Sequence, residues 1–343
     1  MNDIEFSWLS ALNSDEVDQW ADVVDRWIAA DLPGDPSLDR ASSIVGLTRS
    51  PTSGRTRHLL AKRDGQVVGV AELRFSLLDN LHLMEMEDLI VDPRRRNAGV
   101  GSALLAEVER HAAAEGRTTF LTYVCMSIEG GPPRSEAGRK FAEKHGYVRA
   151  AAEIRRRADL READESDLDD MLASAWKKAD GYELVRWIST APDDIVDDVA
   201  YLDSRLIQDA PTGDMDIEPH KVDAARVRER ERESLAKGQL RVNTGVRHAA
   251  SGRLVGWTDI IVMSGSETDA WQGITLVDPE HRGRRLGTIL KIENHRQLRR
   301  YRPMMRYVHT WNDDANSHMI GINEAVGYRA VDQWVAYQKK RDK

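Results

Sequence analysis

Cysteine and metal-binding patterns are scarce in this sequence. A single cysteine, Cys125, among 343 residues excludes an internal disulfide and a zinc cluster built from thiolates. The ten histidines are scattered without a HExxH-type pair, so we expect no metal site. Cys125 lies in the stretch TYVCMSIEG, which favours a core thiol at the end of a buried strand over a nucleophile. The low cysteine content is typical of the reducing cytoplasm.

The sequence also lacks a basic excess and long apolar runs. Lys and Arg number 49 against 57 Asp and Glu, which gives a net charge of −8 and argues against a nucleic-acid binder. No run of about 18 apolar residues is present, so we expect no membrane span. Asp3, Glu5 and Asp15 interrupt any apolar start, so we expect no secretory signal. The length suits a globular protein of roughly two domains.

The chain repeats itself. Val91-Asp92-Pro93 recurs as Val277-Asp278-Pro279, and the other repeated landmarks follow in the same order at nearly the same spacing. These landmarks are Gly65/Gly69 with Gly252/Gly256, Arg96/Gly101 with Arg282/Gly287, and Gly146-Tyr147 with Gly327-Tyr328. Such a repeat indicates two copies of one domain, which we predict at 1–160 (copy one) and 161–343 (copy two).

Hydrophobic periodicity predicts the same mixture of elements in both copies. Each copy is predicted to begin with an edge strand and a helix, followed by a hairpin, a fourth strand, a Gly-bearing loop and a helix, and to end with strand, helix and strand. This order gives an α+β class with a mixed α/β sheet. Between the copies, 164–179 has one apolar face and is predicted to be a linking helix packed on a domain. The charge run 226–233 is typical of a solvated helix face.

A strand–loop–helix segment, LIVDPRRRNAGVGSALL at 89–105, is the candidate ligand site of copy one. Free backbone N–H groups at a helix start attract an anion, and Gly99 and Gly101 let the backbone approach it. Arg96 can add a charge-assisted contact. The segment is neither a Walker loop nor a Gly-x-Gly-x-x-Gly fingerprint. From the residues alone, a diphosphate cradle and a plain tight turn both remain open.

The motif Arg96-x-x-Gly99-x-Gly101, preceded by the hairpin and Val-Asp-Pro, resembles the coenzyme A loop of the GNAT superfamily of N-acetyltransferases. Its duplication is similar to the arrangement of mycothiol synthase and other actinobacterial tandem acetyltransferases. In copy two, TLVDPEHRGRRLG, TWNDDANSHMIGINEAVGY and DAPTGDMD resemble the latter group. The resemblance implies two tandem GNAT (acyl-CoA N-acyltransferase) domains with acetyl-CoA as cofactor.

The resemblance also implies which residues contact coenzyme A. The loop backbone would bind the pyrophosphate, and the pantetheine would lie like an extra strand against 89–91. In copy two, Arg285 replaces the first motif glycine. Its N–H can still serve if that residue keeps an ordinary helical φ; a merely structural loop is the alternative. The implied contacts are Leu89, Ile90, Val91, Arg96, Asn97, Ala98, Gly99, Val100, Gly101 and Ser102 in copy one, and Leu276, Val277, Arg282, Gly283, Arg284, Arg285, Leu286, Gly287, Thr288 and Asn316 in copy two.

Two carboxylates precede the loop of copy one. Glu85 and Glu87 share a face of the predicted strand because side chains alternate with a period of two. Family members commonly use a glutamate here as general base, so Glu85 is the first candidate and Glu87 the second. The alternative is a pair of solvated carboxylates. The matching positions of copy two, Trp271 and Gly273, carry no base, and Asp269 or the loop 209–216 are the possible substitutes.

The family's general acid is a tyrosine that follows an asparagine by seven residues. Counting back from the Gly-Tyr landmarks gives Asn316 and Asn323 in copy two, and Ser135 and Ala142 in copy one. Both copies therefore lack this tyrosine, and water or another tyrosine such as Tyr123 is the alternative acid.

The expected function is transfer of acetyl from acetyl-CoA to a primary amine of a small molecule. We expect direct transfer because no activated nucleophile is visible. The alternatives are an acyl-CoA-binding module without turnover and a protein N-acetyltransferase. The expected partner is a small-molecule amine, without nucleic acid or membrane, and the chain is expected to be a monomer or homodimer.

Overall fold

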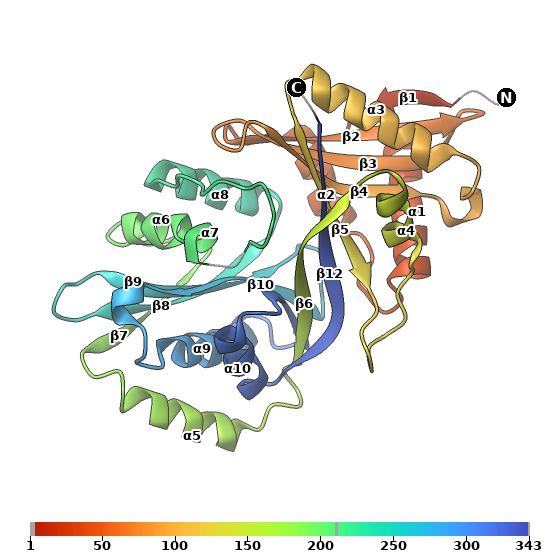
Figure 1. Ribbon diagram of the computed structural model, residues 1–343. Coiled ribbons are helices and arrows are strands. Elements are labelled where there is room, and N and C mark those ends of the chain that lie inside the picture. The colour runs from red at the N-terminus through yellow and green to blue at the C-terminus, as the bar shows by residue number, and fades with distance from the viewer. Residues whose placement is uncertain (1–3, 210–211, 342–343) are drawn as a thin grey trace. The chain divides into compact units, whose positions relative to one another are not determined.

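The chain folds into two compact units whose segments alternate along the sequence. The computed structural model describes residues 4–209 and 212–341. Of these, 4–153, 212–218 and 332–341 form unit 1, and 154–209 and 219–331 form unit 2 (Figure 1). The units overlap the predicted copies over most of their length. The boundaries 1–160 and 161–343, which the sequence repeat suggests for the two copies, stay a prediction.

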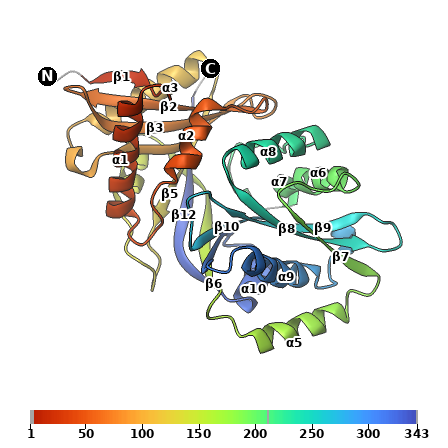
Figure 2. The same cartoon turned by 180° about the vertical axis from the view of Figure 1, so that it is seen from behind.

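Unit 1 contains a mixed sheet with strand order β1-β2-β3-β4-β5-β12, where β12 contributes its residues from Asp332 onward. All neighbours are antiparallel except β4 and β5. Figures 1 and 2 show α3 on one face of this sheet and α1 with α2 on the other. The elements are β1 (Glu5–Trp8), α1 (Ser14–Asp31), α2 (Arg40–Thr48), β2 (Gly54–Arg63), β3 (Gln66–Ser76), β4 (Leu83–Val91), α3 (Val100–Ala114), β5 (Thr119–Met126), α4 (Ala137–Lys144), the start of β6 (Val148–Asp159) and the end of β12 (Tyr328–Lys340).

Local sequence accounts for the elements that frame unit 1. The side chain of Asn13 accepts a hydrogen bond from the N–H of Glu16 and starts α1, which buries Trp20 and Val23 on one face. Between β2 and β3, Asp64 and Gly65 both adopt left-handed φ values, of 51° and 72°, as a two-residue hairpin turn requires.

The last strand of the chain completes the sheet of unit 1. Residues 333–340 of β12 pair antiparallel with β5, with Gln333 opposite Met126 and Lys340 opposite Thr119. Residues 212–218, which contain most of the DAPTGDMD segment, also belong to this unit. Hydrophobic periodicity predicts that a strand exists but not which sheet it joins. The pairing of β12 with the sheet of unit 1 was therefore not visible in the sequence.

Unit 2 repeats the arrangement, with strand order β6-β11-β10-β9-β8-β7, where β6 contributes from Ile154 onward. Here α9 covers one face, α6 and α8 cover the other, and α5 packs on α9 (Figure 1). The elements are α5 (Glu165–Trp176), β7 (Tyr182–Ile188), α6 (Val196–Ser204), α7 (Leu206–Asp209), α8 (Ala224–Ala236), β8 (Leu240–His248), β9 (Leu254–Val262), β10 (Asp269–Val277), α9 (Leu286–Tyr301), β11 (Tyr307–Asp313) and α10 (Ser317–Ala325). The predicted mixed α/β class is confirmed.

Candidate active site

The parallel strands β4 and β5 of unit 1 separate from each other halfway along their length. They pair from Leu83 opposite Thr119 to Met86 opposite Thr122, and no further pairing joins them within the described residues. Both strands nevertheless continue, β4 to Val91 and β5 to Met126. Beyond Met86, the β5-facing side of β4 is therefore a sheet edge, which an extended chain can join by main-chain hydrogen bonds.

A cavity of about 120 Å³ lies at this opening. Glu87 and Asp88 of β4 line one side, Tyr123 and Cys125 of β5 line the other, and residues of α1, α3 and α4 complete the wall. A cavity of about 150 Å³ accommodates a benzene molecule, so this space suits a small acyl group. The expectation that Cys125 is a buried core thiol was wrong: it is half-buried, because the separation of β5 from β4 exposes one side of the strand.

A bulge in β4 changes which residues face the cavity. Glu72 of β3 lies opposite Asp88, but the next residue, Leu73, lies opposite Met86, so Glu87 is the extra residue. Before the bulge, Met84 and Met86 pack with the core under α3. After it, Leu89 and Val91 pack on that core and Ile90 packs with the core under α1. The inversion places Glu85, Glu87 and Asp88 on one face, the face that α1 covers.

Two of the carboxylates on this face, Glu87 and Glu85, lie near the guanidinium of Arg74. Nη1 of Arg74 lies 3.0 Å from Oε1 of Glu87 and 3.9 Å from Oε2 of Glu85. Burial, opposed by Arg74 and reinforced by Glu85 and Glu72, raises the pKa of Glu87 to about 7. Burial and the neighbouring carboxylates of Glu72 and Glu87 raise the pKa of Asp88 to about 7. A carboxyl group with such a pKa changes charge near neutral pH, as a general base should.

Sequence reasoning ranked Glu85 above Glu87 and missed Asp88. Glu85 shares the face with Glu87, as predicted, but only Glu87 and Asp88 are among the residues that line the cavity. Asp88 was missed because alternation along a regular strand places it on the opposite face from Glu87. A bulge of this kind leaves no signal in a single sequence.

Tyr123 lines the same cavity as Glu87 and Asp88. It lies one residue beyond the last paired residue of β5, and its hydroxyl contacts Sδ of Met215 at 3.7 Å. Burial and the negative charges of Glu153, Glu85 and Glu87 raise the pKa of Tyr123, so the phenol is protonated at neutral pH. At the family's tyrosine and asparagine positions, Ala142 and Ser135 line the same cavity without an acidic proton of suitable pKa.

The predicted coenzyme loop of unit 1 leads from β4 into α3. Gly99 precedes the helix with a φ of 81° and has open space around the position of a missing Cβ, so its role is conformational. Gly101 differs, because a Cβ there would lie 3.2 Å from the ring of Phe141. Asn97, Ala98 and Gly99 are exposed, whereas Val100 starts the helix as a buried residue.

The basic residue of the loop has a partner within unit 1. Arg96 makes a bidentate ion pair with Asp31 of α1, at 2.7 and 2.9 Å, and its Nε donates to the carbonyl of Val91 at 3.4 Å. This pairing fixes the loop against the strand and the helix. Ser102, the last predicted contact, lies 3.0 Å from Nε2 of His145 through its hydroxyl. The N–H groups of the loop and of the first turn of α3 remain the groups suited to an anion.

The loop of unit 2 has the same backbone shape despite its different sequence. Arg285 takes the place of Gly99 and adopts a left-handed φ of 57°, so the ordinary helical φ on which a coenzyme-binding role of its N–H depended is not present. The loop geometry imposes the left-handed conformation, and the side chain points to Ser174, whose hydroxyl lies 3.3 Å from Nη1. Of the other predicted contacts, Arg282 donates to the carbonyl of Val277 at 3.0 Å, and Arg284 lies over the ring of Tyr182.

The remaining predicted contacts of unit 2 are divided between core and surface. Leu276 and Leu286 are buried in the apolar core, Gly283 is exposed, and Gly287 and Thr288 are half-buried at the start of α9. Asn316 caps α10 by accepting a hydrogen bond from the N–H of Met319. Its side chain is therefore occupied in a helix cap.

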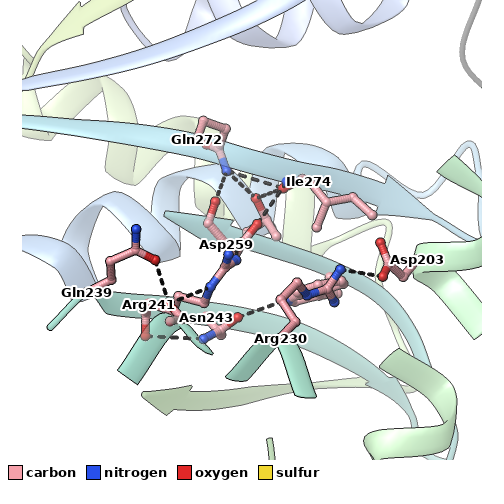
Figure 3. Close-up of polar contacts among 11 residues, drawn as sticks. Asp203, Arg230, Gln239, Arg241, Asn243, Asp259, Gln272 and Ile274 are labelled. Carbon is pink, nitrogen blue, oxygen red and sulfur yellow. Dashed lines mark hydrogen bonds and ion pairs between the residues drawn. The ribbon is translucent and has the colours of Figure 1, made fainter. Parts of the chain in front are cut away.

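The bulge of unit 2 contains no catalytic carboxylate. It occurs at Gly273, where the pairing of β10 with β9 shifts register, and Gly273 and Ile274 take the places of Glu87 and Asp88. A Cβ on Gly273 would overlap the carboxylate of Asp259. Asp259 is only 2% exposed; it accepts a hydrogen bond from the N–H of Ile274 at 2.8 Å and pairs with Arg241 at 2.6 Å. Figure 3 shows Arg241 and Ile274 at this carboxylate, and Gln272 donating from Nε2 to the main-chain carbonyl of Asp259.

Polar side chains occupy the positions that line the cavity in unit 1. Gln272 and Lys291 of unit 2 correspond to Met86 and Leu105 by the repeat spacing. Lys291 is 1% exposed, and its Nζ lies 3.3 Å from Oε1 of Gln272, which also accepts from the hydroxyl of Tyr328 at 3.3 Å. Burial lowers the pKa of Lys291 to about 7. The matching region of unit 2 is thus a hydrogen-bonded core.

The substitute bases predicted for copy two are occupied or lie elsewhere. Asp269 accepts hydrogen bonds from His309 and Thr268, both at 2.7 Å, which lower its pKa although burial opposes them. Asp216 belongs to unit 1 and pairs there with Lys340 at 3.0 Å. The side chain of Asp209 and residues 210–211 of that loop lie outside the described residues.

No helix in the described ranges combines the length and apolar character needed to cross a membrane. Nor does any group of three or more His, Cys, Asp or Glu side chains gather there as a metal site.

Comparison with known proteins identifies the fold. Residues 22–147 match the Acetyltransferase (GNAT) family. A tandem GNAT protein from the clavulanic acid biosynthesis pathway is 28% identical over 99% of both chains, with a TM-score of 0.85. A GCN5-related glucosamine N-acetyltransferase region of a fungal multi-domain β-N-acetylglucosaminidase is 14% identical over 99% of this chain and 38% of that chain, with a TM-score of 0.72. A GCN5-related N-acetyltransferase from Sphaerobacter thermophilus is 15% identical over 98% of this chain and 95% of that chain, with a TM-score of 0.66. These last two show the fold alone. Among curated proteins, none matches the chain.

Residues 22–147 therefore form a GNAT domain, and the match indicates an acetyltransferase. Over its whole length the chain is similar to a tandem GNAT protein, in agreement with the duplicated loop motif. The similarity of arrangement to mycothiol synthase stays a prediction.

Proposed function

We propose that unit 1 transfers an acetyl group from acetyl-CoA directly to a primary amine of a small molecule. The observation that carries this proposal is the cavity at the parting of β4 and β5, lined by Glu87 and Tyr123. Members of the GNAT family bind acetyl-CoA or coenzyme A. In unit 1, the open edge of β4 fits the amide groups of pantetheine, and the exposed N–H groups before α3 fit a pyrophosphate.

Each step has a suitable group in unit 1. Acetyl-CoA, when bound, supplies an acetyl thioester. Glu87 accepts a proton from the acceptor ammonium, whose nitrogen then forms a bond to the acetyl carbon as the carbon–sulfur bond breaks. Tyr123, which its raised pKa keeps protonated at neutral pH, donates its phenolic proton to the departing thiolate, and the second proton that the nitrogen releases as the amide forms returns to the phenolate. The transfer is direct, without a covalent intermediate on the protein.

The contrast between the units supports unit 1 as the acetylating unit. At the two bulges, Gly273 and Ile274 of unit 2 correspond to Glu87 and Asp88 of unit 1. The matching region of unit 2 is filled by Asp259, Gln272 and Lys291. An acyl-CoA-binding role without turnover is the second candidate, and it applies to unit 2, whose loop keeps the same backbone shape.

The test is release of free coenzyme A thiol from acetyl-CoA by the purified chain with a panel of small primary amines. Amine-dependent thiol release together with mass-spectrometric detection of the N-acetylated product is the expected result. Stoichiometric coenzyme A binding without product, for every amine in the panel, contradicts the proposal and favours the binding role.

A further inference from the structure

The acceptor side of the unit 1 cavity has an unbalanced charge. Three carboxylates line the cavity, those of Asp31, Glu87 and Asp88, and no Lys, Arg or His does so within the described residues. Asp31 is neutralised by Arg96 at 2.7 Å, and Glu87 is paired with Arg74 at 3.0 Å. The carboxylate of Asp88 makes no ion pair or hydrogen bond with any part of the chain that the structure describes.

The bulge determines where that unpaired carboxylate points. In a regular strand, Glu87 and Asp88 would face opposite sides of the sheet. The register shift between Glu72 and Leu73 instead brings both onto the face that α1 covers, with Glu72 directly opposite Asp88. A carboxylate that remains without a cation while others surround it favours a ligand that brings a positive charge.

We propose that Asp88 selects acceptors that carry a second cationic nitrogen, so that the favoured substrate of unit 1 is a diamine or a longer polyamine without a carboxylate. This inference rests on the proposed function of unit 1. Glu87 receives the nitrogen that is acetylated, and Asp88 binds the second ammonium. An acceptor with a carboxylate beside its amine is repelled by both.

The repeat provides an internal contrast. The residue that matches Asp88 in unit 2 is Ile274, whose side chain packs in the apolar core with Trp257 and Leu276. The cationic preference therefore belongs to unit 1 alone. Both units have the bulge, but only in unit 1 does the bulged strand itself carry carboxylates there.

The test compares three acceptors with the same four-carbon chain: butylamine, diaminobutane and aminobutyrate. With acetyl-CoA at saturation and at neutral pH, where amines of pKa about 10.4 are protonated, we expect kcat/KM for diaminobutane to exceed that for butylamine by at least about tenfold. We expect kcat/KM for aminobutyrate to be lower than that for butylamine by at least about tenfold. The full-length chain is used throughout.

Asp88→Asn assigns the effect. We expect the preference for diaminobutane over butylamine to fall to within about twofold in this variant, through KM rather than kcat. Asp18→Asn, on the outer side of α1 with its side chain 75% exposed, is the matched control and should keep the preference. A thermal melt shows whether Asp88→Asn folds as the parent chain does.

The outcomes separate this inference from the proposed function. Equal turnover of butylamine and diaminobutane, or a preference that survives in a folded Asp88→Asn chain, overturns the inference and leaves acetyl transfer intact. Calorimetric titration of diaminobutane into the chain with coenzyme A gives a readout without turnover. Binding that Asp88→Asn abolishes supports the inference even if no acetyl is transferred, in which case the proposed function alone fails; absence of both binding and turnover overturns both.

Discussion

Replacing Glu87 with Gln tests the assignment of the general base. The substitution keeps the size of the side chain and removes its ability to accept a proton. General-base assistance contributes about 10²- to 10⁴-fold, so we expect kcat to fall by at least about 100-fold, roughly 3 kcal/mol of barrier. Because the loop before α3 is unchanged, the affinity for acetyl-CoA should stay within about twofold.

The pH dependence gives a sharper signature than the loss of rate. Burial raises the pKa of Glu87 to about 7, and only its ionised form accepts a proton. The ionised fraction therefore rises about tenfold between pH 6 and pH 8. The titration of the acceptor amine affects wild type and variant alike, so the ratio of their kcat/KM values isolates Glu87. That ratio should rise about tenfold over this interval.

Glu85→Gln is the control for the same assay. Glu85 lies 3.9 Å from Arg74 on the same face but outside the cavity wall, so its loss should lower kcat by less than about tenfold. Because the charge of Glu85 helps to raise the pKa of Glu87, the rise of activity with pH should persist in this variant but move to lower pH. A wild-type to Glu87→Gln ratio that is flat with pH, or a larger loss for Glu85→Gln, would refute the reasoning and return the role to Glu85.

Two further predictions concern unit 2. Arg285→Gly should stabilise the protein by about 1 kcal/mol in denaturant unfolding, because a left-handed φ is unfavourable for arginine and the contact with Ser174 is weak and exposed; a loss of stability would mean that this contact dominates. Lys291→Met should stabilise unit 2 by on the order of 3 kcal/mol at pH 7, because burial lowers the pKa of Lys291 to about 7 from 10.5. The unfolded wild-type chain binds more protons between these values, so wild-type stability should rise with pH from about 7 to about 10.5, and that slope should disappear in the variant. Equal slopes in urea titrations of the two proteins would contradict this account.

The features visible in the sequence are those set by local periodicity. The strand 83–91, the helix that follows it and the repeat at Val277-Asp278-Pro279 all follow from alternating or helical patterns and turn residues, and the structure has them. The resemblance to the GNAT family rested on the loop before α3. Its glycines are explained locally, because Gly99 adopts a left-handed φ and a Cβ on Gly101 would approach Phe141. These observations were enough for the fold and for the face shared by Glu85 and Glu87.

The features that could not be predicted from the sequence depend on tertiary structure. One extra residue at Glu87 reverses the faces of β4 and brings Asp88 to the cavity, but it has no signature in composition or spacing. The last strand pairs with β5 because of the packing of unit 1, which no local pattern determines. Arg285 adopts a positive φ because the loop requires it, against the preference of the residue.

The central claim, that acetyl transfer takes place in unit 1, is tested most directly by a matched pair of loop variants. Gly101 and Gly287 occupy the same motif position, and a side chain at either would meet a neighbour, Phe141 at 3.2 Å or Ile322 at 3.1 Å. Gly101→Glu and Gly287→Glu are compared by amine-dependent thiol release at a fixed acetyl-CoA concentration. We expect the rate of amine-dependent thiol release to fall by at least about 100-fold in Gly101→Glu and to change by less than about threefold in Gly287→Glu. Full activity of Gly101→Glu together with loss in Gly287→Glu would contradict it and place the reaction in unit 2.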